Sequence, residues 1–160
     1  MLYRPGHMIA STAITQQIVE ELYAEALLLA DEARTAFDLS DAQDPVLEAN
    51  EVRIAMSIEG LRTTTRVMNS LAWLLNQRAY FSGELSREQL KKHGTLGEER
   101  PSDPRNMARL PLKVRSLIRD TERLHGRVAR LDREQRSRDA ANDDPVGSLR
   151  GRIADAFGAA

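Results

Sequence analysis

The sequence predicts an all-α protein, an antiparallel three-helix bundle with a long second helix. Apolar residues recur every three or four positions in three long segments, and most prolines and glycines lie between or beyond them. No segment alternates apolar and polar residues as a half-buried strand does. The chain has 160 residues, the length of one domain, with 41% apolar side chains. We expect an irregular lead-in at 1–10, the bundle at 11–139 and a flexible tail at 140–160.

The first helix is predicted to begin at a Ser11 or Thr12 cap and to extend to about Asp41. This segment contains one basic and seven acidic side chains, a net charge of −6. Its apolar positions are Ile14, Ile18, Leu22, Leu29, Ala33 and Phe37.

The second helix is predicted to begin at Asp44-Pro45, a capping carboxylate followed by a first-turn proline, and to end near Phe81. A helix of about 36 residues spans about 54 Å, which a subunit of this size covers poorly, so we expect a homodimer. A neighbouring apolar stripe holds Val67, Leu71 and Leu74. The stripe expected to face the core comprises Ile54, Ile58, Leu61, Thr65, Met68, Ala72, Leu75 and Ala79.

Residues 82–108 form a polar loop rich in glycine and proline, in which Ser86-x-x-Gln89 can cap a short helical turn. Bundle connections usually need 2–8 residues, and we favour a disordered insertion over a functional loop. The third helix is predicted to begin near Leu110-Pro111. Between Arg109 and Arg138 it carries ten basic and four acidic side chains, which favours the acidic first helix as its neighbour. Its heptad seam is Leu110, Val114, Leu117, Thr121, Leu124, Val128 and Leu131.

A polar stripe of the second helix is the candidate interaction surface. Aromatic and arginine side chains set together on a polar face resemble an interaction hot spot, which a second copy or another protein could contact. The alternative is that Trp73, the only tryptophan, packs at the edge of the core against the first or third helix. The candidate residues are Glu59, Arg62, Arg66, Asn69, Trp73, Gln77 and Tyr80, and Asn76 shares the stripe.

The sequence offers little material for catalysis, so we expect neither an enzyme nor a cofactor. It contains no cysteine and three histidines, and His7 and His93 fall in irregular segments. Glu122-x-x-His125 matches half of a di-iron helix motif, but that motif must occur twice, and we interpret the pair as solvated. Phosphate-binding loops and nucleophile motifs are absent from the sequence.

A net charge of −1 argues against nucleic acid as the main partner. The alternative is a DNA-associated regulator that uses the third helix, where arginines recur at near-helical spacing among acidic residues: Arg115, Arg119, Arg123, Arg127 and Arg130. No apolar run approaches the roughly 18 residues of a membrane span, and the first residues do not resemble a signal peptide, so we expect a cytoplasmic protein.

The tail after Asp139 carries Leu149, Ile153, Ala156 and Phe157 at helical spacing, weakened by two glycines. We expect it to be flexible alone and to form a short helix when bound to another molecule.

The second helix also carries a family resemblance. Residues 59–68, Glu-Gly-Leu-Arg-Thr-Thr-Thr-Arg-Val-Met, and 73–79, Trp-Leu-Leu-Asn-Gln-Arg-Ala, resemble the alphaproteobacterial RcdA-like family, which includes the regulator of CtrA degradation. Residues 22–26, 32–38, Leu110-Pro111 and 127–132 look similar too, whereas Gly60 stands where a serine is expected.

The resemblance implies a non-enzymatic adaptor, a dimeric helical bundle that helps to deliver cell-cycle regulators to the Clp protease. Its implied partners are protease adaptors or response regulators. The residues that match the family motif, without roles assigned by the match, are Glu59, Arg62, Thr64, Thr65, Arg66, Trp73, Gln77 and Arg78.

Overall fold

The computed structural model describes residues 14–38 and 50–158, and it places six helices and no strand in them. The predicted all-α class is therefore confirmed for the described part of the chain. The long helices are α1 (Gln16–Ala36), α2 (Asn50–Phe81) and α5 (Leu112–Asp143). The short ones are α3 (Arg87–His93), α4 (Pro104–Arg109) and α6 (Pro145–Phe157).

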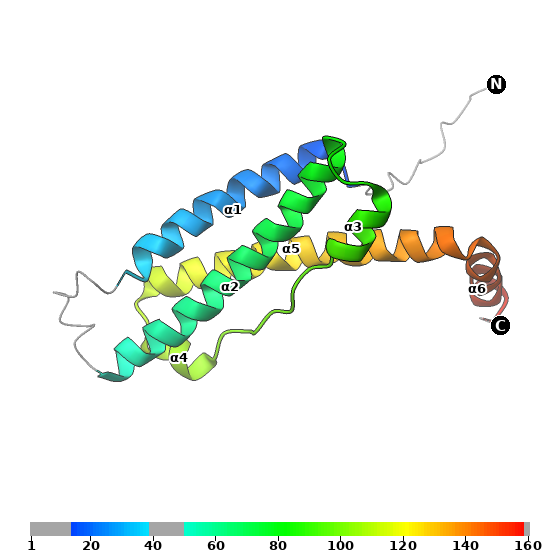
Figure 1. The fold of residues 1–160 in the computed structure, drawn as a ribbon. Coiled ribbons are helices and arrows are strands. Elements are labelled where there is room, and N and C mark those ends of the chain that lie inside the picture. The colour runs from blue at the N-terminus through cyan, green and yellow to red at the C-terminus, as the bar shows by residue number, and fades with distance from the viewer. Residues whose placement is uncertain (1–13, 39–49, 159–160) are drawn as a thin grey trace, which may run out of the picture.

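The three long helices pack side by side, and each contacts the other two (Figure 1). One apolar cluster joins them around Ala26 of α1, Leu74 of α2 and Leu124 of α5. A second cluster, around Met56, Met107 and Ile118, joins one end of α2 to α4 and α5. The predicted third-helix seam is confirmed as a core stripe, because six of its seven residues are buried and Leu131 packs against the first cluster.

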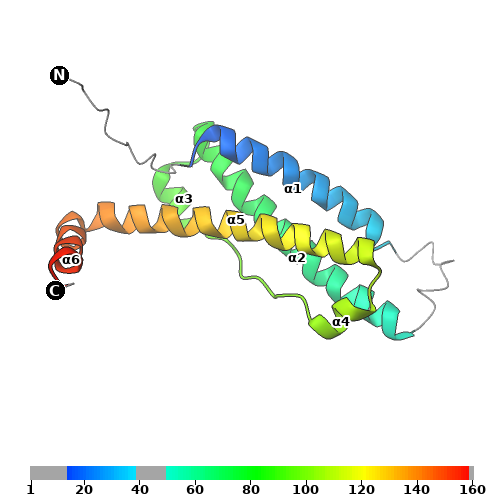
Figure 2. The same ribbon diagram turned by 180° about the vertical axis from the view of Figure 1, so that it is seen from behind.

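The helices are not arranged antiparallel throughout, and this corrects the prediction. Arg66 and Gln77 of α2 contact Thr121 and Gln135 of α5, in the same order along both helices. The two helices therefore run in the same direction, and α1 runs opposite to both (Figures 1 and 2). In an up-down-up bundle the first and third helices would be the parallel pair.

The length of the connection between α2 and α5 explains this arrangement. After α2 the chain forms α3, whose predicted Ser86–Gln89 capping box is present, and then returns along the helices to α4 (Figure 1). The returning segment, here called the strap, is residues 94–103, and ten extended residues reach up to about 33 Å. The loop is thus an ordered return path, and the interpretation as a disordered insertion is wrong.

Several predicted helix ends are shifted or lie outside the described residues. Thr15 caps α1 through a bond from the Ile18 amide to its hydroxyl, whereas Ser11, Thr12 and Asp44-Pro45 lie outside the described residues, as does the predicted lead-in. A Cβ on Gly60 would come 2.9 Å from Phe37 Cδ1, so this glycine lets the Phe37 ring, at the C-terminal cap of α1, pack closely against α2.

The orientation of α2 about its own axis is the reverse of the predicted one. The stripe expected in the core points to solvent: Leu61 is 71% exposed and Met68 59%. The polar stripe opposite to it is buried, with Arg66 and Trp73 each only 1% exposed. The neighbouring residues Val67, Leu71 and Leu74 supply the apolar contacts of α2 instead.

Beyond the predicted end of the third helix, the structure continues α5 to Asp143 and then places α6 across its end (Figures 1 and 2). Asp144 caps α6 by accepting a bond from the Gly147 amide, and Pro145 occupies the first turn. Within the described ranges, none of the helices combines the length and apolar character needed to span a membrane.

Candidate functional site

The predicted interaction surface on α2 does not lie at the surface as a whole. Glu59, Arg66, Trp73 and Gln77 are fully buried inside the subunit, and only Arg62, Asn69 and Tyr80 keep partial exposure. These polar groups can be buried because most of them form hydrogen bonds with the strap, α4 or α5.

Arg66 is the centre of a buried polar cluster. Its Nε donates to Glu99 of the strap at 2.5 Å, and a second nitrogen donates to the Thr121 hydroxyl of α5 at 3.1 Å. The third nitrogen donates to the carbonyl of Arg100 at 3.1 Å and lies 3.6 Å from Glu122. One guanidinium thus ties the strap to both α2 and α5, a use that suits its rigid fork of donors.

Glu59 holds the end of the strap that leads into α4. Its Oε1 accepts bonds from the Asp103 amide at 3.2 Å, the Asn106 amide group at 3.0 Å and Arg62 at 2.8 Å. Asn69 donates to the Glu98 carbonyl at 3.2 Å. Four polar residues of α2, namely Glu59, Arg62, Arg66 and Asn69, thus help to hold the strap and the start of α4, or hold one another.

Trp73 and Gln77 face α5. The indole Nε1 of Trp73 donates to Asp132 at 3.0 Å, and the side-chain amides of Gln77 and Gln135 exchange two hydrogen bonds. Asp132 also pairs with Arg136 at 2.7 Å. The alternative interpretation of Trp73, a core-edge residue packed on the third helix, is the one that matches this geometry.

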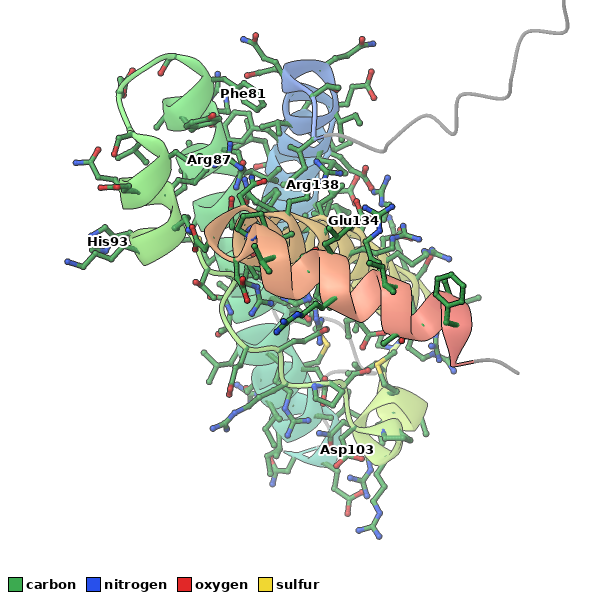
Figure 3. All side chains as sticks on the ribbon, turned by 90° about the vertical axis from the view of Figure 1, so that its right-hand side faces the viewer. Phe81, Arg87, His93, Asp103, Glu134 and Arg138 are labelled. Carbon is green, nitrogen blue, oxygen red and sulfur yellow. The ribbon has the colours of Figure 1, made fainter. Side chains whose placement is uncertain are left out.

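The Glu122–His125 pair also serves the strap. Glu122 accepts from the Ser102 hydroxyl at 2.5 Å, and the Nδ1 of His125 lies 3.1 Å from Glu99. No group of three or more histidine, cysteine, aspartate or glutamate side chains within the described ranges could hold a metal ion. His93 sits at the outer edge of α3 (Figure 3), and His7 lies outside the described residues.

The arginines of α5 divide between two environments. Arg127 pairs with Glu25 of α1, as the opposite charges of the two helices predict, and Arg123 pairs with Asp120 of its own helix. Arg115, Arg119 and Arg123 border an open hollow beside Leu112. The DNA-binding alternative stays a prediction.

Two ion pairs fasten α3 to the far end of α5. Arg87 donates to Asp139 at 2.9 Å and Lys91 to Asp143 at 2.6 Å. These hydrogen bonds raise the pKa of the Arg87 guanidinium and the pKa of the Lys91 ammonium above their ordinary values. The residues after Asp139, predicted to be a tail, therefore help to position α3.

Two uncovered apolar surfaces remain as the candidate site. The first is the outer stripe of α2, the eight residues from Ile54 to Ala79 given above, most of them exposed. The second is on α6, where no residue is buried and Phe157 is 81% exposed. Its apolar side chains are Val146, Leu149, Ile153 and Phe157.

Sequence reasoning found the α6 residues by their helical spacing but assigned the outer stripe to the core. One signal could have corrected it. A stripe that holds the only tryptophan together with Arg66, Gln77 and Glu59 has enough donors and acceptors to form a buried network, so it competes with the apolar stripe for the interior.

Comparisons with known proteins give a consistent picture. The family described as "Protein of unknown function (DUF1465)" matches residues 10–157. The structure is similar to the crystal structure of RcdA from Caulobacter crescentus CB15, with a TM-score of 0.60 and 28% sequence identity, over 77% of this chain and 93% of that one. No curated protein matches the chain by sequence.

Proposed function

This chain belongs to the DUF1465 family, here identified as RcdA-like, and on that premise we propose that it is a non-catalytic adaptor that binds other proteins. The observation that carries the proposal is the similarity to RcdA, a regulator of CtrA degradation, over nearly the whole length of that chain. By this similarity, the adaptor helps to deliver regulatory proteins to a Clp protease in the cytoplasm.

The geometry supports binding rather than chemistry. The buried polar groups of α2 and α5 are engaged with the strap and with one another, as the Arg66 and Trp73 contacts illustrate. The described surface also exposes large apolar side chains along the outer stripe of α2 and on α6. Large exposed apolar patches are typical of surfaces that bind proteins.

We assign the two apolar surfaces to two kinds of partner. The outer stripe of α2 suits a second copy of the chain, which makes the adaptor a homodimer. The α6 face suits a protein partner, such as another protease adaptor or a response regulator, that receives an amphipathic helix in a groove. Its anchors at 146, 149, 153 and 157 follow the helical repeat such grooves recognise.

Complementation tests the function. The chain would be expressed in Caulobacter crescentus cells lacking RcdA, and the half-life of CtrA measured after protein synthesis is stopped. We expect the chain to restore CtrA degradation, and a chain truncated after Asp144 to fail. An unchanged CtrA half-life with the full chain present at normal levels would contradict the proposal.

The position of the truncation matters. Removing residues after Asp139 would delete Asp143, which holds Lys91, as well as α6. Ending the chain at Asp144 removes α6 alone and keeps both ion pairs of α3. A matched full-length variant, Phe157→Ala, removes the most exposed anchor of α6 without shortening the chain, and it should weaken the capture of the same partners from a native lysate.

A further inference from the structure

The outer stripe of α2 has the pattern of a helix–helix seam. Its eight residues are separated by alternating steps of four and three, the heptad spacing that keeps one line of side chains against a partner helix. It contains no charged residue, and charge depletion marks the buried centres of interfaces.

The stripe lies on the side of α2 that faces away from the rest of the subunit. The residues of α2 in contact with α1, α5 and the strap, such as Arg66, Trp73 and Leu74, are buried, whereas Ile54, Leu61 and Met68 are more than half exposed. Nothing within the described part of the chain covers the seam, so its apolar side chains are available to another molecule.

We infer that the occupant is α2 of a second copy, packed antiparallel, with the twofold axis between Thr65 and Met68. The inference rests on the proposed homodimer and adds its surface and orientation. In a twofold interface each contact occurs twice, so the stripe has to be complementary to its own reverse.

The sizes of the side chains meet this requirement. When the stripe is reversed about the point between Thr65 and Met68, three of the four unique pairs place a large residue opposite a small one, as interdigitated packing needs. The pairs are Ile54 with Ala79, Ile58 with Leu75, Leu61 with Ala72 and Thr65 with Met68.

A parallel pairing in register fits less well, because each residue would then face its own copy. Ala72 would meet Ala72 and Leu61 would meet Leu61, which leaves a gap at one layer and crowds another. At the borders of the antiparallel seam, the flanking arginine Arg62 comes near Asn69 of the second copy, and no like charges are opposed.

Cysteine cross-linking tests the orientation, since the natural chain has no cysteine. Ile58→Cys and Leu75→Cys variants would be prepared singly and co-expressed, then treated with a short thiol cross-linker. We expect a covalent dimer only from the co-expressed pair, because positions 58 and 75 lie about 25 Å apart along a helix. Cross-linking of each variant alone would overturn the antiparallel orientation. Ser116→Cys on the exposed surface of α5 is the control.

Sedimentation equilibrium separates this inference from the proposed homodimer. Leu61→Glu should raise the dimer dissociation constant at least about 100-fold, whereas Leu28→Glu, at an exposed leucine of α1, should leave it unchanged. If the natural chain and the Leu61→Glu variant were equally dimeric, the assignment of the dimer interface to α2 would be overturned and the proposed homodimer would stand. A monomeric natural chain would overturn both. Circular dichroism checks that the variants stay helical.

Discussion

The two sides of α2 have exchanged the roles that their composition suggests. The inner side carries a glutamate, an arginine, a glutamine and the tryptophan, all with almost no exposure, while the outer stripe carries isoleucine, leucine and methionine in solvent. The amphipathic character of a helix therefore does not by itself show which side faces the subunit core. A polar side can be buried if other elements bring it partners, and an apolar side can be exposed if another molecule covers it.

The inner side is stable because its charges are shared. Arg66 contacts two carboxylates, a hydroxyl and a carbonyl, and Glu59 binds two donors at the end of the strap and Arg62. Such a network is costly to disrupt, because the loss of one partner leaves a buried charge unpaired. Substitutions on the inner side should therefore destabilise the subunit, and those on the outer stripe should affect association.

The largest effect is expected for Arg66→Ala. It leaves Glu99 without its shortest hydrogen bond and releases the strap from α2, so the free energy of unfolding should fall by about 3–5 kcal/mol. Urea unfolding measures this, with Leu61→Glu as a background that removes association. Met68→Ala in the same background should cost less than about 1 kcal/mol, since its side chain is exposed. Equal losses at both positions would contradict the contrast between the two sides.

A smaller effect is expected for Trp73→Phe, which keeps a buried ring but loses the bond to Asp132. Asp132 retains Arg136, so we expect a loss of about 1–3 kcal/mol in thermal or urea unfolding, with the dimer dissociation constant unchanged. This replaces the expectation from sequence that the position mediates binding. If the variant lost dimerisation while keeping full stability, Trp73 would belong to an interface after all.

The smallest effect is expected for Asp139→Asn, which weakens the attachment of α3. Its partner Arg87 is more than half exposed, so the cost should stay below about 1 kcal/mol, and amide exchange at Leu90 should accelerate.

The second attachment of α3, the ion pair of Lys91 with Asp143, depends on pH: since Asp143 raises the pKa of Lys91, the contribution of this pair to stability should be complete at neutral pH. It should be lost as the pH rises above about 10.5. If neither change altered how much more slowly the Leu90 amide exchanges than an unstructured amide at the same pH, the ion pairs would not hold α3.

The sequence predicted the α1 and α5 core stripes well, because each of these helices has one apolar stripe and a strongly charged remainder. Leu124 and Val128, for example, are both fully buried, as their heptad positions predict. For α2 the prediction failed, since it has two apolar stripes and one polar stripe, and the periodicity is the same whichever one faces inward. The candidate residues of the polar stripe were recognised as unusual, but their partners in the strap lie about 30 residues away and have no helical pattern to reveal them.

What the sequence alone determined is local: roughly where the three long helices lie, where Ser86 and Gln89 cap a helix, and which residues share a side, because these depend on neighbours within a few positions along the chain. The tertiary structure decided two further matters. It set α5 parallel to α2 by leading the connection back along the helices, and it turned the polar side of α2 inward to bind that connection. Both depend on contacts such as Arg66 with Glu99, between residues 33 positions apart, whose geometry exists only when the strap and the helices have assembled.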